Sequence, residues 1–123
     1  MLRRSVAQGI IIKMREDPGN IAIVHESEYI KAVEAAEAAI ANGADTALLI
    51  EIAESGGYNA GFCLQLCDRI RKGAPGCRLL LLCPEQNEMS VSAAGEAMRN
   101  GRIDDFLFYD ASIEFLVSKL LEI

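Results

Sequence analysis

The sequence predicts an α/β protein in which a parallel sheet lies between layers of helices. Two nearly continuous apolar segments, TALLIEI over residues 46–52 and RLLLLC over residues 78–83, have the length of strands. They lack the alternation of a strand with one solvated face, which is typical of strands that are covered on both faces. Candidate helices separate the candidate strands, and the turns between them are short. This order favours parallel strands joined by helical crossovers in a three-layer sandwich.

The first part of the chain is predicted to fold as helix, strand, helix and strand. In residues 2–16, apolar side chains recur at four-residue intervals among charged neighbours, which indicates a helix that ends at Asp-Pro-Gly-Asn. Residues 21–24 (IAIV) form a short predicted strand. Residues 28–42 are rich in the strongest helix formers, and the Asn-Gly pair at their end is a C-terminal cap signal. The strand over residues 46–52 follows.

The middle of the chain is predicted to add one helix and one strand. A glycine-rich loop (ESGG) leads to a helix over about residues 60–72. Leu64, Cys67 and Ile70 recur on one side of this helix, so we expect them to point inward. Glycine and a Pro-Gly pair end the helix, and the strand over residues 78–83 then runs up to a proline.

The last part of the chain is predicted to be helix, strand and helix. A helix over about residues 88–100 ends at a second Asn-Gly pair, and residues 106–109 (FLFY) form the last strand. Ser112 is a candidate N-cap for the final helix, because its hydroxyl can accept a hydrogen bond from the first turn. We expect Leu116 and Leu120 on the buried side of that helix.

The whole chain, residues 1–123, has the size and composition of one globular domain, with 51% hydrophobic and 24% charged residues. Its net charge of −6 opposes direct binding to nucleic acid or to anionic membranes, since both attract clustered lysine and arginine. No apolar run approaches the roughly 20 residues of a membrane span. The first residues lack the apolar segment of a signal peptide. We therefore expect a cytoplasmic protein.

The four cysteines, Cys63, Cys67, Cys77 and Cys83, form no C-x-x-C pair. Cys63 and Cys67 lie four residues apart, on one face of a predicted helix, and Cys83 ends an apolar strand. A buried free cysteine behaves as a small hydrophobic residue. We interpret all four as reduced structural thiols and expect no bound metal.

Several segments in order resemble a known family. An apolar strand with an acidic end (ALLIEI), a helix ending in RIRK, the strand LLLLC, the sequence IDDFLFYD and the helix SIEFLVSKL follow one another. This order is similar to the receiver (CheY-like) domains of bacterial two-component response regulators. The opening LRRSVAQGI and REDPGNIAIVHES also resembles receivers of regulators with a LuxR-type DNA-binding half. The resemblance covers nearly the whole chain and implies a flavodoxin-like fold with strand order 2-1-3-4-5.

The chain departs from the family at its start. The family begins with a central strand that ends in an acidic pair, whereas this chain begins at the helix that follows that strand. Either the first strand is absent, or residues 9–12 form it with Glu16 and Asp17 behind it. We favour its absence, because the second option leaves too few residues for a helix and another strand before residue 46. A sheet without its central strand exposes two edges, which exchange of strands in a homodimer would cover. A homodimer through the face made by the last helix and strand is the other possibility.

The chain also departs from the family at the residues that handle phosphate. The resemblance places Glu51 where the family has the phosphoaccepting aspartate, and Cys83 where it has a serine or threonine. Tyr109 stands in the place of the lysine, and Asp110 in the place of the proline that follows. The aromatic switch position is kept, as Phe106.

These replacements predict a domain that signals without being phosphorylated. Phosphoryl transfer requires a carboxylate in line, a metal ion and fixed positive charge. Glu51 is one methylene longer than aspartate, Cys83 is a weak donor, and Tyr109 is uncharged at neutral pH. We therefore expect no catalytic residue, no bound magnesium and no other cofactor. The expected activity is signal transduction by contact with a protein partner or with a second copy of the chain.

Other interpretations stay open from the sequence. Glu51 is a permanent carboxylate that imitates an activated state, an ordinary acidic residue at a strand end, or a drifted position in a domain kept for dimerisation. A phosphoaccepting receiver truncated at its start is one alternative function. A phosphocysteine carrier that uses Cys83 is another, although Pro84 removes an N–H group there, and Glu85 and Glu88 repel phosphate.

Overall fold

The computed structural model describes most of the chain from residue 28 onward. The residues described are 28–43, 45–53, 57, 59–108 and 112–121. The predicted helix over residues 2–16, the predicted strand over residues 21–24 and the possible strand over residues 9–12 lie outside them, as does Tyr109.

The described part alternates helices and strands, as the sequence predicts. The helices are α2 (Tyr29–Ala41), α3 (Ala60–Gly73), α4 (Glu88–Arg99) and α5 (Ile113–Leu121). The strands are β1 (Ala47–Glu51), β2 (Arg78–Cys83) and β3 (Asp105–Phe108). Each observed boundary lies within one residue of the predicted boundary, so this part of the secondary structure prediction is confirmed.

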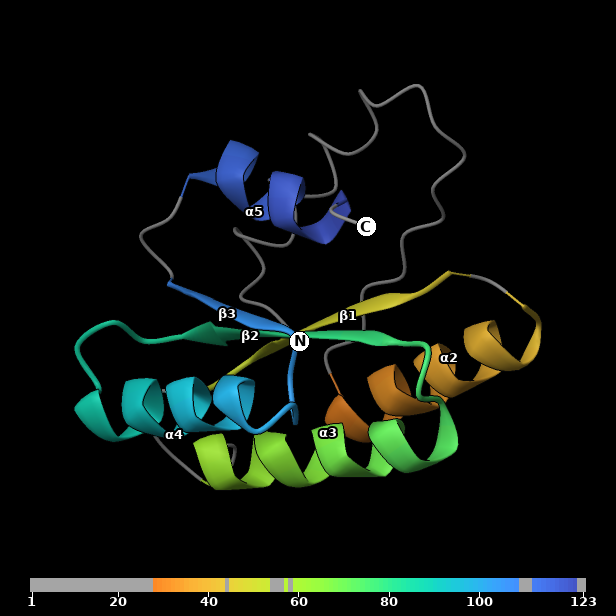
Figure 1. Ribbon diagram of the computed structural model, residues 1–123, viewed down its shortest axis with the longest axis horizontal. Helices are drawn as coiled ribbons and strands as arrows, with labels where there is room; N and C mark the ends of the chain where they lie inside the picture. Colours follow the sequence, from red (N-terminus) through yellow and green to blue (C-terminus); the bar gives the residue numbers. More distant parts are fainter. Residues whose placement is uncertain (1–27, 44, 54–56, 58, 109–111, 122–123) are drawn as a thin grey trace.

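The three strands form a parallel sheet in the order β1-β2-β3. Leu80 of β2 pairs with Leu49 of β1 and with Asp105 of β3, which fixes the register across the sheet. Helices α2, α3 and α4 cover one face of the sheet, and α5 lies over the other (Figure 1). The predicted α/β fold, a flavodoxin-like arrangement with adjacent parallel strands, is therefore confirmed.

The central strand β2 is buried on both faces. Every side chain over residues 79–83 is 0% exposed. Because side chains alternate along a strand, Leu79, Leu81 and Cys83 share one face and belong to the core cluster formed with α2, α3 and α4. Leu80 and Leu82 face the other way, toward the layer that contains α5.

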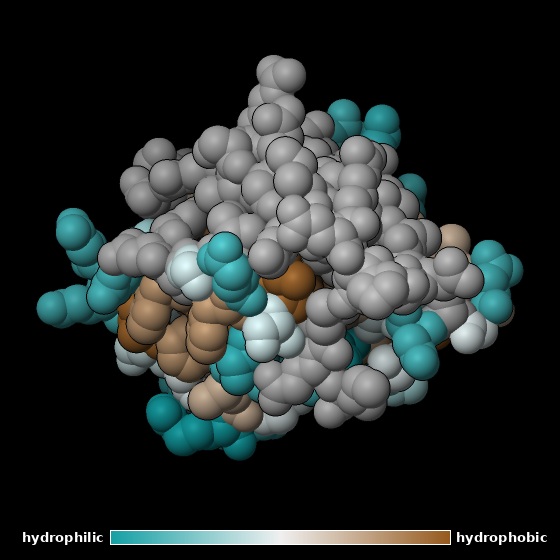
Figure 2. Space-filling view, turned by 90° about the horizontal axis from the view of Figure 1, so that it is seen from above, coloured by the Kyte–Doolittle hydropathy of each residue, from teal (hydrophilic) through white to brown (hydrophobic). Residues whose placement is uncertain are grey.

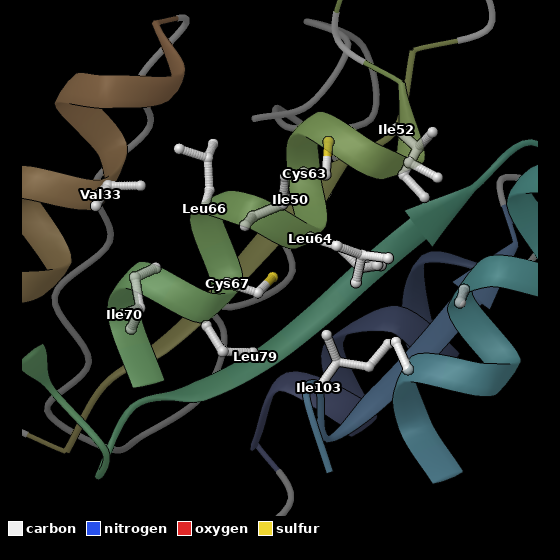
Figure 3. Packing of buried hydrophobic residues seen from close by; sticks show 14 of the residues in the cluster. Val33, Ile50, Ile52, Cys63, Leu64, Leu66, Cys67, Ile70, Leu79 and Ile103 are labelled. Carbon is white, nitrogen blue, oxygen red and sulfur yellow. The ribbon is translucent and has the colours of Figure 1, made fainter. Parts of the chain in front are cut away.

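The largest share of the core lies between α3 and the sheet. Leu64, Cys67 and Ile70 point from α3 toward the strands, as predicted, and Cys63, next to Leu64, belongs to the same buried cluster (Figure 3). All four are at most 5% exposed. Leu64, Cys67 and Ile70 recur every three residues, and Cys63 lies four residues before Cys67 and seven before Ile70, so all four fall on one side of the helix.

Short polar residues set the helix ends. The side chain of Ser112 accepts a hydrogen bond from Phe115 N at 3.1 Å, which confirms the predicted cap of α5. Both Asn-Gly pairs end helices, and Gly43 and Gly101 have the positive φ that glycine tolerates best. Leu116 is buried, as predicted, whereas Leu120 is only partly buried because it lies in the last turn of α5.

Helix α5 is bonded to the sheet through its C-terminal end. The guanidinium of Arg78, the first residue of β2, donates to Lys119 O at 2.8 Å and to Leu120 O at 3.0 Å. Both carbonyls lie in the last turn of α5, so the arginine binds the C-terminal end of the helix and complements the negative end of its dipole. An ion pair between Lys119 and Asp105 of β3 adds a second link, at 3.4 Å.

In the part of the chain that the structure describes, no helix is long and apolar enough to cross a membrane.

We predict that Arg78→Ala lowers the free energy of unfolding by about 1–2 kcal/mol, because two charge-assisted hydrogen bonds to α5 are lost. Denaturant unfolding measures the change. Arg99→Ala is the matched control, since Arg99 is exposed at the end of α4 and its removal should change stability by less than about 0.5 kcal/mol. Equal effects of the two substitutions would contradict this role for Arg78.

Candidate functional site

The edge of the sheet at which the strands end contains the candidate site. Parallel strands bring their C-terminal ends to one edge, and ligand sites of open α/β sheets lie there. Glu51 is the last residue of β1, and Cys83 is the last residue of β2. Helices α3 and α4 begin beside them, each with an asparagine side chain that caps its first turn.

Glu51 is partly exposed, and its main chain is held by two neighbouring helices. The hydroxyl of Tyr29, in α2, donates to Glu51 O at 2.6 Å. The thiol of Cys63, in α3, lies 3.7 Å from the same oxygen. The place that the resemblance assigns to the phosphoacceptor is therefore an ordered part of the fold.

Cys83 lies in the core rather than at an open site. Its side chain is 0% exposed and packs in the cluster with α2, α3 and α4. Burial raises the pKa of its thiol from 9.0 to about 12, so the thiol is protonated at neutral pH. A phosphocysteine carrier needs an accessible thiol with a lowered pKa, and this geometry argues against that alternative.

The structure does not bring the side chains of Glu51 and Cys83 together. In the ladder between β1 and β2, Glu51 pairs with Leu82, so these two side chains share a face. Cys83 is the next residue, and it points to the opposite face, into the helix-covered core. Tyr109, the third of the replaced positions, lies outside the described residues.

Phe106 lies within β3 and not at the C-terminal end of the strand. It pairs with Leu81 of β2, two residues before the end of β3. Its half-buried ring packs against the core and meets Phe108 edge to face, with 5.9 Å between the ring centroids. Phe106 is therefore at the expected strand, with its ring on the face covered by α2, α3 and α4.

Arginine side chains lie toward the other end of the strands, and two of them are paired with aspartates. Arg71 at the end of α3 pairs with Asp104 at 2.9 Å, and Arg102 binds Asp68 through two hydrogen bonds of 2.8 and 3.0 Å. Arg78, which bonds to α5, is at the start of β2. These guanidinium groups stabilise the fold far from Glu51. Nowhere in the described ranges are three His, Cys, Asp or Glu side chains grouped to hold a metal ion.

Sequence reasoning missed Tyr29 and the role of Cys63 at this edge. Tyr29 is 22 positions from Glu51 along the chain, and nothing in the local pattern links the two. The available signal was an aromatic residue with a hydroxyl at the start of a helix, since a partly buried tyrosine usually finds a hydrogen-bond partner.

Comparison of the chain with protein-family models, with curated proteins and with solved structures gave no match.

We predict that the cysteines of the native protein react very slowly with a thiol reagent at pH 8. Cys63, Cys67, Cys77 and Cys83 are each at most 1% exposed, and burial raises the pKa of each thiol to about 11 or 12. All four should react once denaturant unfolds the chain. Rapid reaction of Cys83 in the native protein near neutral pH would instead revive the phosphocarrier interpretation.

The same thiols make stability depend on pH, and the direction follows from their raised pKa. Between about pH 9 and pH 11 the thiols of the unfolded chain lose their protons while those of the folded chain keep them. The free energy of unfolding should therefore fall as the pH rises through this range. Cys83→Ala should make the fall less steep, and an equal slope in the variant would contradict the assignment of a buried neutral thiol.

Proposed function

We propose that this chain is a receiver-like signalling domain of the two-component type that works through protein contacts and is not phosphorylated. The proposal rests on the resemblance of its ordered segments to receivers. The parallel order β1-β2-β3, with three helices on one face and α5 on the other, supports it. An acidic residue, Glu51, at the end of β1 also agrees with it.

The proposal that the domain is not phosphorylated rests on the opposite orientation of the Glu51 and Cys83 side chains. A phosphorylation site must present a carboxylate, a hydroxyl and a cation around one phosphoryl group. Here the residue at the hydroxyl position is a protonated thiol that is sealed in the core on the other face. Glu51 is then a permanent carboxylate at the place where a phosphoryl group would add negative charge.

Contact with a second copy is the mode of action that we favour. Helices α4 and α5 flank β3 from the two faces of the sheet (Figure 1), and each exposes a large hydrophobic side chain. Phe115 is 47% exposed and Met98 is 39% exposed. Figure 2, a view from the α5 side, shows hydrophobic residues at the surface next to polar ones. Among the described strands, β3 pairs only with β2, so its other side is open to a further strand. The apolar side chains on both sides of β3 make this region suitable for contact between two copies of the chain.

Phosphorylation tests the proposal directly. We predict that incubation with magnesium and phosphoramidate leaves the intact mass of the protein unchanged, because Cys83, the residue at the family's hydroxyl position, is buried on the face opposite Glu51. A receiver known to accept phosphate from this donor, run in the same reaction, shows that the donor is active. A stoichiometric adduct of the wild type that disappears in Glu51→Gln would overturn the proposal.

A second variant separates the effect of side-chain length at residue 51 from the effect of the residues around it. Glu51→Asp restores the shorter carboxylate that the family uses but leaves Cys83 buried and turned away. We expect this variant to remain unmodified as well. A phosphorylated Glu51→Asp variant would mean that the length of the side chain alone blocks the chemistry.

Self-association is tested by sedimentation. We predict a dimer at tens of micromolar, a concentration typical of modest protein affinities, and a shift toward monomer in Phe115→Asp. Ile30→Asp is the matched control, because Ile30 is 45% exposed but lies on α2, away from β3. A monomeric wild type, or equal effects of the two substitutions, would rule out a dimer through α4, β3 and α5.

A further inference from the structure

The first turn of α2 is bonded to the end of β1 by one side chain. Tyr29 is the first residue of α2, and its hydroxyl donates to Glu51 O at 2.6 Å across 22 positions of the chain. Glu51 is the last residue of β1. The next N–H group, that of Ile52, donates to Leu82 O of β2 at 2.9 Å. The peptide unit that joins Glu51 to Ile52 is thus held by α2 through its oxygen and by β2 through its nitrogen.

The ring of Tyr29 also connects the end of β1 to α3. It meets the ring of Phe62 edge to face, with 5.7 Å between the centroids and an angle of 78°. Cys63, the neighbour of Phe62, places its sulfur 3.7 Å from the Glu51 oxygen that the tyrosine hydroxyl approaches. Three elements, α2, β1 and α3, therefore meet at a single carbonyl group.

These contacts suggest a local cooperative unit within the domain. The first turn of a helix has few hydrogen bonds of its own, so side-chain contacts determine how often it opens. Tyr29 supplies such a contact for α2, and Phe62 receives the ring in the first turn of α3. Loss of the tyrosine hydroxyl would release the start of α2 and the end of β1 together.

We propose that Tyr29 is a latch that couples the first turn of α2 to the end of β1 and the first turn of α3. By linkage, a change that loosens the Glu51 main chain then loosens the first turn of α2, and the reverse holds with the same coupling free energy. The latch does not depend on the proposed function, because it follows from main-chain and ring contacts whatever the Glu51 carboxylate does.

Hydrogen exchange followed by NMR in Tyr29→Phe tests the latch. This variant keeps the ring against Phe62 and removes only the hydroxyl. Three amides report on the coupled segments: Ala32, bonded to Glu28 O, Ile52, bonded to Leu82 O, and Cys63, bonded to Asn59 O. We expect all three to exchange about five- to tenfold faster, the factor that loss of one hydrogen bond produces.

The matched control amides are in the first turns of the other helices. Val91 of α4 and Leu116 of α5 are bonded in the same way within their own first turns, and their exchange should change by less than twofold. An unchanged rate at Ala32, Ile52 and Cys63, or equal acceleration of these amides and the controls, would overturn the latch. Ile103→Val removes one methyl group from the core and lowers the stability of the whole domain. The exchange rates of this variant show how the same amides respond to a global loss of stability.

A measurement on the unaltered protein gives an independent check. If Ala32, Ile52 and Cys63 open in one event, low concentrations of denaturant must accelerate their exchange with one common slope. Three different slopes would show that the segments open separately and would overturn the coupling without any substitution.

Discussion

Burial of β2 on both faces is the constraint on which the rest of the structure depends. Five consecutive side chains, residues 79–83, are fully removed from solvent. A strand of this kind needs a neighbour on each edge and a helical layer on each face. Strands β1 and β3 supply the neighbours, α2, α3 and α4 cover one face, and α5 lies on the other. Arg78 at the start of the same strand holds the end of α5 in place.

The same constraint separates the residues at the candidate site. Since side chains alternate along β2, its last residue, Cys83, must continue the row of Leu79 and Leu81 into the core. Glu51 pairs with Leu82, so its side chain points to the opposite face of the sheet. A strand end that serves the core in this way cannot also present a polar group to a phosphoryl oxygen. At the end of β1 lies Glu51, whose main-chain oxygen is bonded to the hydroxyl of Tyr29.

The fold was predictable from the sequence because its signals are local. Apolar runs gave β1 and β2, and the Asn-Gly pairs and Ser112 gave helix ends to within a residue. The site was less predictable, because it depends on register. A slip of one residue between β1 and β2 would have placed Glu51 and Cys83 on one face, and no local pattern fixes that register. The contact between Tyr29 and Glu51 depends on how α2 packs, which is also not encoded locally.

The central claim is that Glu51 and Cys83 point to opposite faces of the sheet, and side-chain NOE contacts in solution test it most directly. The β-protons of Cys83 should show contacts with Cys63 and with other side chains of α3, and none with α5. The β- and γ-protons of Glu51 should show contacts with the side chain of Leu82 and none with Cys83. Direct NOEs between the side chains of Glu51 and Cys83 would contradict the account, because the two residues would then line one site.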